Sequence, residues 1–296
     1  MMPIPNRKGP APEEIRRRRL IALAAISGAL LVGGIAIVVA ISHVRGSHAQ
    51  TTAPLAPETF RIVFPEGFTR AQMAVRVQDV AGIARRKSHK PVQLNAKGYL
   101  LASRRASIPC ILPHARSSLE GFLFPATYDF VGTTTPIQLV QAQLQAFCQN
   151  WQQVNLAYAR SKNLTGYEVV KIASMVEKEA LAPEERKLVA AVIYNRLHAH
   201  MPLGIDATVR YGFHIPPTQS ILESQLQSNN PYNSRRVAGL PPTPIANPGL
   251  ASLQAAAHPA HVDYLYYVRK PDKVHHFFTA SATAFAHYEC AHGYGC

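Results

Sequence analysis

Residues 172–212 read IASMVEKEALAPEERKLVAAVIYNRLHAHMPLGIDATVRYG and place Glu177 and Glu179 at the end of one helix, before a second helix and a turn-rich loop. At about 100° per residue, the apolar side chains of the first helix form one stripe, made of Val169, Ile172, Ala173, Val176 and Ala180. Glu179 falls about 20° outside one edge of this stripe, and Glu177 about 40° outside the other.

The position of Glu179 beside the apolar stripe has a chemical consequence. A carboxyl on a partly apolar helix face is poorly solvated, so its pKa should rise. A carboxylic acid that stays protonated at neutral pH can protonate a leaving oxygen, such as that of a glycosidic bond. On spacing alone, two solvated carboxylates at a helix end explain the pattern at least as well, because structural carboxylates also have perturbed pKa values.

Capping residues and a proline predict where the two helices begin. Thr165 and Glu168 form a capping box that begins the first helix. Pro183 begins the second helix, which is expected to run to about residue 198. Its buried stripe is predicted to contain Leu188, Val189, Val192, Ile193 and Leu197.

Outside this stretch, strands and helices are mixed. Residues 60–64 favour a strand, followed by a helix capped by Thr69. The aromatic residues 119–130 suit a strand or loop, and Thr135 before Pro136 predicts a helix to about residue 152. Two short strands are expected at 264–268 and 276–279, around a turn at residues 271–272. Because no regular βαβ alternation is present, an α+β fold is predicted. Residues 216–249 are rich in Pro, Asn and Gly, and so long a structureless stretch is usually functional.

The charge of the chain favours an anionic partner. Its 296 residues carry a net charge of +14, of which residues 1–19 contribute six basic and two acidic side chains. Nucleic acid, anionic lipid or an anionic cell-wall polymer would all suit such a charge.

Residues 20–41 are an uninterrupted uncharged run of 22 residues, long enough to span a bilayer. Four arginines precede the run, so residues 1–19 should form a cytoplasmic basic arm and the rest of the chain should lie across the membrane. We therefore predict a single-pass plasma-membrane protein with a linker at 42–58; this topology weakens a nucleic-acid interpretation. The alternative is a cleaved signal peptide, for which residues 47–49 (SHA) offer a cleavage site.

Four cysteines lie in the predicted exported part, where an oxidising compartment permits two disulfides. Three pairings are open; the local pair Cys290 with Cys296 would leave Cys110 with Cys148. The chain has no CxxC spacing, and its loop histidines, such as His258 and His261, are more often ordinary polar residues than ligands. Neither a metal site nor a cofactor is predicted.

Seven stretches together resemble the MltG/YceG-like endolytic murein transglycosylases, in their order and spacing, from about residue 60 to 278. They are FRIVFPEGFT, LEGFLFPATY, ASMVEKEA with EERKLVAAVIYNRL, MPLGIDATVRYG, NPYNSRRVAGLPPTPIANPG, SLQAAAHPAHVDYLYYV and the final HHFF. The resemblance implies cutting of the MurNAc–GlcNAc bonds of nascent peptidoglycan strands without water. The products would carry 1,6-anhydro-MurNAc ends, and the reaction would limit strand length beside penicillin-binding proteins.

The family's catalytic residue is the second Glu of the EKE motif, which falls on Glu179. The implied mechanism needs one carboxyl, which protonates the glycosidic oxygen and then accepts the proton of the muramyl C6 hydroxyl as that hydroxyl attacks C1. Because the nucleophile is part of the sugar, no second carboxylate has to activate water.

Other motif positions are weaker candidates for support or substrate binding. Glu120 could bond sugar or orient Glu179, or could be a structural carboxylate bonded to backbone. Asn195, with its neighbour Arg196, could pin the second helix against the site or simply cap and solvate it. The remaining candidates are those expected to line the sugar groove and the motif histidine of the strand pair: Asp206, Thr208, Tyr232, Asn233 and His276. Tyr232 could equally be a core residue.

Two departures from the family pattern bear on the prediction. Members usually carry a LysM-like wall-binding segment, often with two strand–helix units, whereas this chain has room for one. We therefore predict a reduced LysM-like subdomain at 59–116, of doubtful wall binding, and a catalytic domain at 117–296. The usual QTDPTV-like loop reads GIDATV here, with Gly204, Ile205 and Ala207 replacing typical residues, which should make the loop more flexible.

Three other functions compete with the enzyme. One is a non-catalytic peptidoglycan-binding scaffold of the wall-synthesis complex, against which the complete EKE motif argues. Another is a membrane-tethered nucleic-acid binder, motivated by the positive charge. The last is a two-carboxylate muramidase with Glu120 as partner, which would leave a reducing sugar end instead of an anhydro end.

Overall fold

The computed structural model describes residues 57–104, 110 and 118–294, with residues 13, 14, 16, 17, 19–21 and 24 near the N-terminus. The chain divides into two units, Met1–Ala56 and Pro57–Cys296, and the second unit holds the site. Within the described ranges no helix is long and apolar enough to cross a bilayer. The predicted span at 20–41 lies almost entirely outside those ranges, as do most of the basic arm and the linker.

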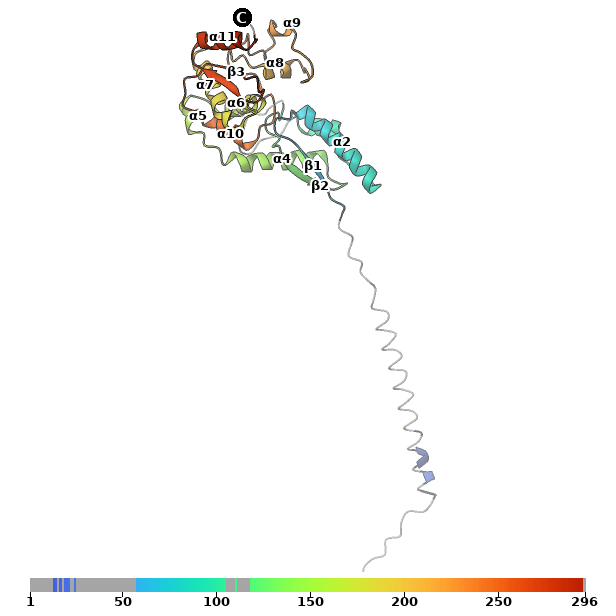
Figure 1. Cartoon of the computed structure of the whole chain (residues 1–296). Helices are drawn as coiled ribbons and strands as arrows, with labels where there is room; N and C mark the ends of the chain where they lie inside the picture. Colours follow the sequence, from blue (N-terminus) through green and yellow to red (C-terminus); the bar gives the residue numbers. More distant parts are fainter. Residues whose placement is uncertain are drawn as a thin grey trace, which may run out of the picture. The chain divides into compact units, whose positions relative to one another are not determined.

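The mixed α+β class is confirmed for the described part of the second unit, which is largely helical with two small sheets (Figure 1). Its elements follow in this order: β1 (Phe60–Val63), α2 (Arg70–Ser88), α3 (Ala96–Ala102), β2 (Thr127–Phe130), α4 (Pro136–Trp151), α5 (Ala157–Ser161), α6 (Gly166–Glu179), the 3-10 turn η1 (Pro183–Glu185), α7 (Arg186–His198), α8 (Asp206–Gly212), α9 (Glu223–Leu226), α10 (Leu250–Ala257), β3 (Tyr266–Arg269), β4 (His276–Thr279) and α11 (Ala282–Ala291).

Local capping signals placed the helix starts correctly. Thr69, Thr135 and Thr165 each accept a hydrogen bond from the backbone N–H three residues later, and a Gln or Glu side chain at that position returns one. Each threonine thus satisfies an N–H that a helix start leaves without a partner. The helix that carries the EKE motif therefore begins and ends where the sequence predicts, with Glu179 as its last residue.

The first sheet joins two distant parts of the chain. β1 pairs with β2 in antiparallel register, with Phe60 opposite Phe130. α2 packs against α3 beside this sheet. The strand of the predicted LysM-like subdomain, β1, thus pairs with a strand that lies beyond the predicted boundary between residues 116 and 117. The division into a LysM-like subdomain and a catalytic domain stays a prediction.

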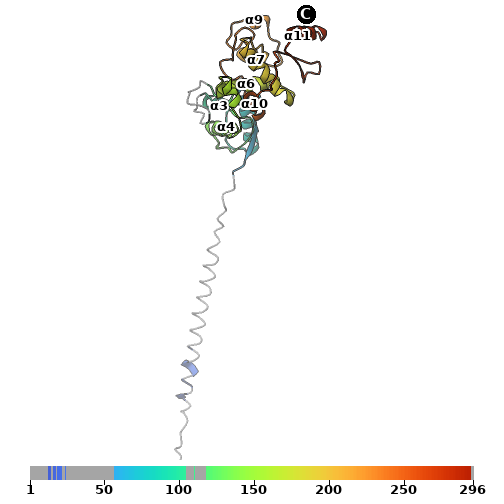
Figure 2. The same cartoon turned by 90° about the vertical axis from the view of Figure 1, so that its left-hand side faces the viewer.

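α6 lies at the centre of the unit and packs most extensively on α10 (Figures 1 and 2). The five apolar positions of its predicted stripe are all buried. Burial of a valine or isoleucine side chain stabilises a fold by about 1.5–3 kcal/mol, so the three larger residues of this stripe hold the end of α6 in the core. On α7, the three central residues of the predicted stripe are buried and the two outer ones, Leu188 and Leu197, are half-buried.

The stretch 216–249, expected to lack regular structure, contains the short helix α9. Two further local predictions need correction. The stretch predicted as a flexible turn-rich loop contains α8, which begins at Asp206. The residues before it are held in place, since Gly204 N–H donates to Ser234 O at 2.9 Å and Ile205 is buried. Gly204 has φ +66°, a conformation that favours glycine, so this residue builds the tight turn into α8. The second correction concerns Pro183, which opens a 3-10 turn before α7 instead of the α-helix itself.

A disulfide joins Cys110 to Cys148 on α4, with the Cα atoms 5.4 Å apart. This is the pair that the local pairing of the other two cysteines would leave. Cys290 is also disulfide-bonded, and Cys296 lies outside the described residues.

Candidate active site

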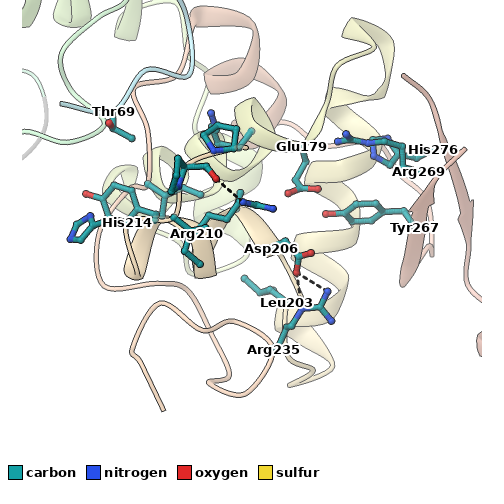
Figure 3. Close-up of a pocket in the computed structure, with 18 of the residues that line it drawn as sticks. Thr69, Glu179, Leu203, Asp206, Arg210, His214, Arg235, Tyr267, Arg269 and His276 are labelled. Atoms are coloured by element: carbon teal, nitrogen blue, oxygen red, sulfur yellow. Dashed lines mark hydrogen bonds and ion pairs between the residues drawn. The ribbon is translucent and has the colours of Figure 1, made fainter. Parts of the chain in front are cut away.

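A pocket of about 1190 Å³ lies where the start of α2, the end of α6, α8 and the β3–β4 hairpin meet (Figure 3). The long stretch 216–249 contributes Pro216, Pro217, Arg235 and Ile245 to its wall. Charged and polar side chains gather there, among them Arg70, Glu120, Glu179, Arg196, Asp206, Arg210, Arg235, Tyr267, Arg269 and His276. A cavity of this size accommodates more than one sugar-sized group and offers them carboxyl, hydroxyl and guanidinium groups.

Glu179 reaches this pocket from the C-terminal end of α6 and is half-buried. Burial raises the pKa of its carboxyl from 4.5 to about 7. Arg269 and hydrogen bonds from the Tyr267 hydroxyl and the Ala207 N–H lower the pKa, and the nearby charge of Asp206 raises it. The pKa rise expected from the helix face is therefore present, and a large share of Glu179 is protonated at neutral pH.

Glu177, two residues before Glu179, has a different environment. Its Oε2 accepts a hydrogen bond of 3.0 Å from the N–H of Gly249, the residue before α10, and the side chain does not line the pocket. Two residues apart on one helix end, one glutamate thus fastens a neighbouring helix and the other faces the cavity.

Glu120 also lines the pocket and is 3% exposed. Both of its oxygens accept from the N–H of Arg70, at 2.9 and 3.1 Å, in the first turn of α2. Asn247 Nδ2 donates to Oε1 at 2.8 Å and the Tyr211 hydroxyl to Oε2 at 3.2 Å. Burial raises the pKa of Glu120 to about 7 against these bonds. Its contacts are those of a carboxyl bonded to backbone and neighbouring side chains.

His276 also lines the pocket, at the start of β4, and is buried. Its Nδ1 lies 2.7 Å from Glu185 Oε2, and its backbone N–H donates to Glu185 Oε1 at 2.9 Å. Its ring meets the Tyr267 ring edge to face, with centroids 5.3 Å apart. His276 thus connects the start of α7 to the tyrosine that bonds Glu179.

Asp206 lies at the start of α8 and forms an ion pair of 2.6 Å with Arg235, which Figure 3 shows beneath Glu179. Asn195 does not line the pocket; its amide donates to the carbonyls of Val262 and Tyr264, both at 2.9 Å. Its neighbour Arg196 does line it, and donates to the Leu265 carbonyl at 2.6 Å. This pair of residues therefore fastens α7 to the segment that leads into β3.

The structure does not bring the other three candidates to the pocket wall. Thr208 is buried and bonds Ile205 O and Ser234 Oγ. Asn233 is buried and donates to three carbonyls of the chain before it. The Tyr232 hydroxyl lies 2.8 Å from Thr243 Oγ1, and its ring packs on Tyr211. All three build the frame behind α8.

Sequence reasoning missed Tyr267, Arg269, Glu185 and Asn247. A signal existed for Tyr267, which lies inside the strand predicted at 264–268. Arg269 lies one residue past the predicted end, on the same face of β3 as Tyr267. Nothing local marks Asn247 or Glu185 as partners, because their contacts reach across 127 and 91 residues of the chain.

In the described part of the chain, no group of three or more His, Cys, Asp or Glu side chains is placed to hold a metal ion. His258 and His261 pack their rings against Tyr158 instead.

The sequence and fold are similar to those of known proteins. Residues 43–289 match the model of the YceG-like family. An endolytic murein transglycosylase of Streptococcus pneumoniae strain R6 is 33% identical over 241 residues, which cover 74% of this chain and 42% of that protein. One from Bacillus subtilis strain 168 is 36% identical over 154 residues, covering 51% of this chain and 42% of that protein. This chain thus spans less than half the length of these relatives. The crystal structure of a YceG-like protein from Listeria monocytogenes superposes with a TM-score of 0.62 at 27% identity, covering 77% of this chain and 75% of that one.

Proposed function

This chain belongs to the YceG-like family, and from that premise we propose that it is an endolytic murein transglycosylase. It cleaves the bond between MurNAc C1 and GlcNAc O4 inside nascent peptidoglycan strands and leaves 1,6-anhydro-MurNAc ends, so that it limits strand length. The observation that carries the proposal is Glu179: a carboxyl with a pKa of about 7 on the wall of a pocket large enough for sugars.

The proposed chemistry uses Glu179 twice. As an acid, it gives its proton to the glycosidic oxygen while the C1–O4 bond breaks. As a carboxylate, it then accepts the proton of the muramyl C6 hydroxyl, whose oxygen forms the new bond to C1. Glu179 ends protonated, as it began, and no water is consumed. A pKa near the working pH suits a group that has to donate and accept in one cycle.

The surroundings of Glu120 support a one-carboxyl mechanism. A hydrolytic glycosidase needs a second carboxylate to attack the sugar or to activate water. Glu120 accepts its hydrogen bonds from Arg70, Asn247 and Tyr211, so its oxygens are already committed to the protein. This favours the anhydro product over a reducing end.

The test is mass spectrometry of the products of uncrosslinked glycan strands, treated with the full chain or its Glu179→Gln variant. We expect internal fragments with anhydro-muramyl ends from the wild type and none from the variant. Reducing ends would replace the transglycosylase by a muramidase. Cleavage by neither protein, with strands still bound, would favour the non-catalytic scaffold.

We also propose that the catalytic unit acts outside the cell, anchored in the plasma membrane through residues 20–41 with the N-terminus cytoplasmic and beside penicillin-binding proteins. The uncharged run after the arginines and the disulfide between Cys110 and Cys148 support this placement. Protease added to intact spheroplasts should degrade the folded unit and spare an N-terminal tag. Protection of both would contradict the topology.

A further inference from the structure

Figure 3 shows the side chains of Tyr267 and Glu179 pointing toward one another, with the hydroxyl placed to donate a hydrogen bond that lowers the pKa of the carboxyl. Tyr267 is on β3 and Glu179 on α6, so the contact joins two elements that nothing local connects. A hydrogen bond of this kind restricts rotation of the carboxyl about its last bond. The Ala207 N–H on α8 lowers the pKa of the same carboxyl, so donors from β3 and α8 both act on Glu179.

The ring of Tyr267 is itself held from behind. The ring of His276 packs edge to face on it. The Glu185 carboxylate in turn bonds both the Nδ1 and the backbone N–H of His276. Glu185 and His276 are 6% and 4% exposed, so their hydrogen bonds are made away from water, where an unpaired partner would be costly. The pair fixes the position of β4 relative to α7.

The β3–β4 hairpin is also fastened at its entrance. Asn195 and Arg196, at the end of α7, donate to the carbonyls of Val262, Tyr264 and Leu265 just before β3. Glu185 lies just before the start of α7 and the Asn195 pair near its end, so one helix holds the hairpin at two places. Tyr267 lies on the hairpin between these attachments.

We propose that Tyr267 is a positioning residue for Glu179, and that the buried pair of Glu185 and His276 acts on Glu179 through the Tyr267 ring. The inference rests on the proposed function, because it assigns a role in the same reaction. It adds residues that the one-carboxyl mechanism itself does not require.

Other charges face Glu179 and must be kept constant in any test by pH. Arg269 on β3 lowers its pKa, and Asp206 on α8 raises it while bound to Arg235. The charge of Arg196 on α7 acts on Tyr267 and lowers the pKa of its hydroxyl. Because the hydrogen bond from Tyr267 also lowers the pKa of Glu179, its removal should raise that pKa. Activity depends on protonated Glu179, so the high-pH limb of the rate profile should move to higher pH.

The first experiment measures the rate of anhydro-end formation by the full chain from pH 5 to 9, for the wild type and Tyr267→Phe. The substitution keeps the ring and removes the hydroxyl. We expect a rate loss of roughly 10- to 100-fold and a high-pH limb displaced upward. The matched control is Tyr128→Phe, which removes a hydroxyl that donates to the Phe124 carbonyl at 2.8 Å, away from the pocket. It should leave rate and limb unchanged.

The second experiment tests whether His276 acts through Tyr267. His276→Gln should displace the high-pH limb in the wild-type background and have no further effect in Tyr267→Phe. His275→Gln is the matched control, because His275 is the exposed neighbour whose partners are Asp272 and Glu184. If His276→Gln fails to fold, Glu185→Gln takes its place with the same expectation in both backgrounds.

The outcomes separate the two proposals. A wild type that makes no anhydro ends, or a Glu179→Gln variant that still makes them, overturns the proposed function. With that function intact, a Tyr267→Phe limb that stays at its wild-type pH overturns the positioning role of Tyr267. Equal displacement by His276→Gln in both backgrounds means that His276 does not act through the tyrosine.

Discussion

Two buried or half-buried glutamates with pKa values of about 7 line the pocket, yet their carboxyls have different partners and different roles. Glu120 accepts hydrogen bonds from Arg70, Asn247 and Tyr211 and so ties the start of α2 to the loop before α10. Tyr267 and Ala207 lower the pKa of Glu179 as hydrogen-bond donors, and its carboxyl still faces the cavity. Burial raises both pKa values alike; the remaining freedom of the oxygens distinguishes the acid from the structural carboxyl.

The contrast also shows the limit of pKa as a guide to function. Desolvation is the largest cause of the shift at both residues. It reports only how little water reaches the carboxyl, and a carboxyl buried to hold a frame loses water as readily as one buried to donate a proton. The partners have to be counted before a role is assigned.

The largest expected effect is the loss of cleavage on substitution of Glu179. Glu179→Gln removes the transferable proton and should lower the cleavage rate by about 10³-fold or more, with the fold intact. Glu177→Gln is the control, because its amide oxygen can still accept from Gly249 N–H, and it should cost far less. Rates of anhydro-end formation measure both, and equal losses would contradict the separate roles of the two residues.

The next effect is on stability and concerns Glu120. Glu120→Ala leaves the Arg70 N–H and the Asn247 amide without their acceptor, and we expect the free energy of unfolding at pH 5 to fall by about 3 kcal/mol or more. Glu120→Gln keeps one acceptor oxygen and should cost less. Urea unfolding measures both variants. A Glu120→Ala protein as stable as the wild type would mean that these hydrogen bonds do not hold the frame.

The pH dependence of stability follows from the same two pKa values. Each carboxyl has a folded pKa of about 7 against 4.5, so the folded state binds more protons between these values. The contribution of each carboxyl to the free energy of unfolding is therefore complete below about pH 4.5. It is lost as the pH rises through 7, by up to about 3 kcal/mol for each group. In Glu120→Gln the share of Glu120 disappears, so the unfolding free energy should fall less between pH 5 and 8. Identical slopes would show that Glu120 is ionised throughout.

The smallest expected effect is a shift of the pH–rate profile when one of the two charges beside Glu179 is removed. Asp206→Asn removes a negative charge that raises the pKa of Glu179, so the high-pH limb of activity should move to lower pH. Arg269→Gln removes a positive charge that lowers this pKa, and the limb should move to higher pH. Each displacement should be about one pH unit or less, because both side chains border the open cavity. Rate profiles of the two variants moving in the same direction would contradict this electrostatic account.

Much of the frame could be predicted because its signals are local. The capping boxes at Thr69, Thr135 and Thr165 each act over three residues, and the apolar stripe on α6 follows from helical periodicity. The paired strands at the C-terminal end were also predicted, with β4 at residues 276–279 as the structure has it. Local reasoning failed at α8, where Gly204 and buried contacts to Ser234 set up a helix start that the loop-like composition of the stretch conceals.

The candidate site divides in the same way. The sequence by itself determined that Glu179 ends a helix beside an apolar stripe, because this follows from residues within one or two helical turns. It left open whether the carboxyl is solvated, and the raised pKa comes from burial by the packed core. Only the tertiary structure decided that Tyr267 would bond Glu179, that Glu120 would be occupied by Arg70 and Asn247, and that Glu177 would fasten α10. These contacts join residues 50 to 127 positions apart in the chain, and their partners meet only when the whole core has packed.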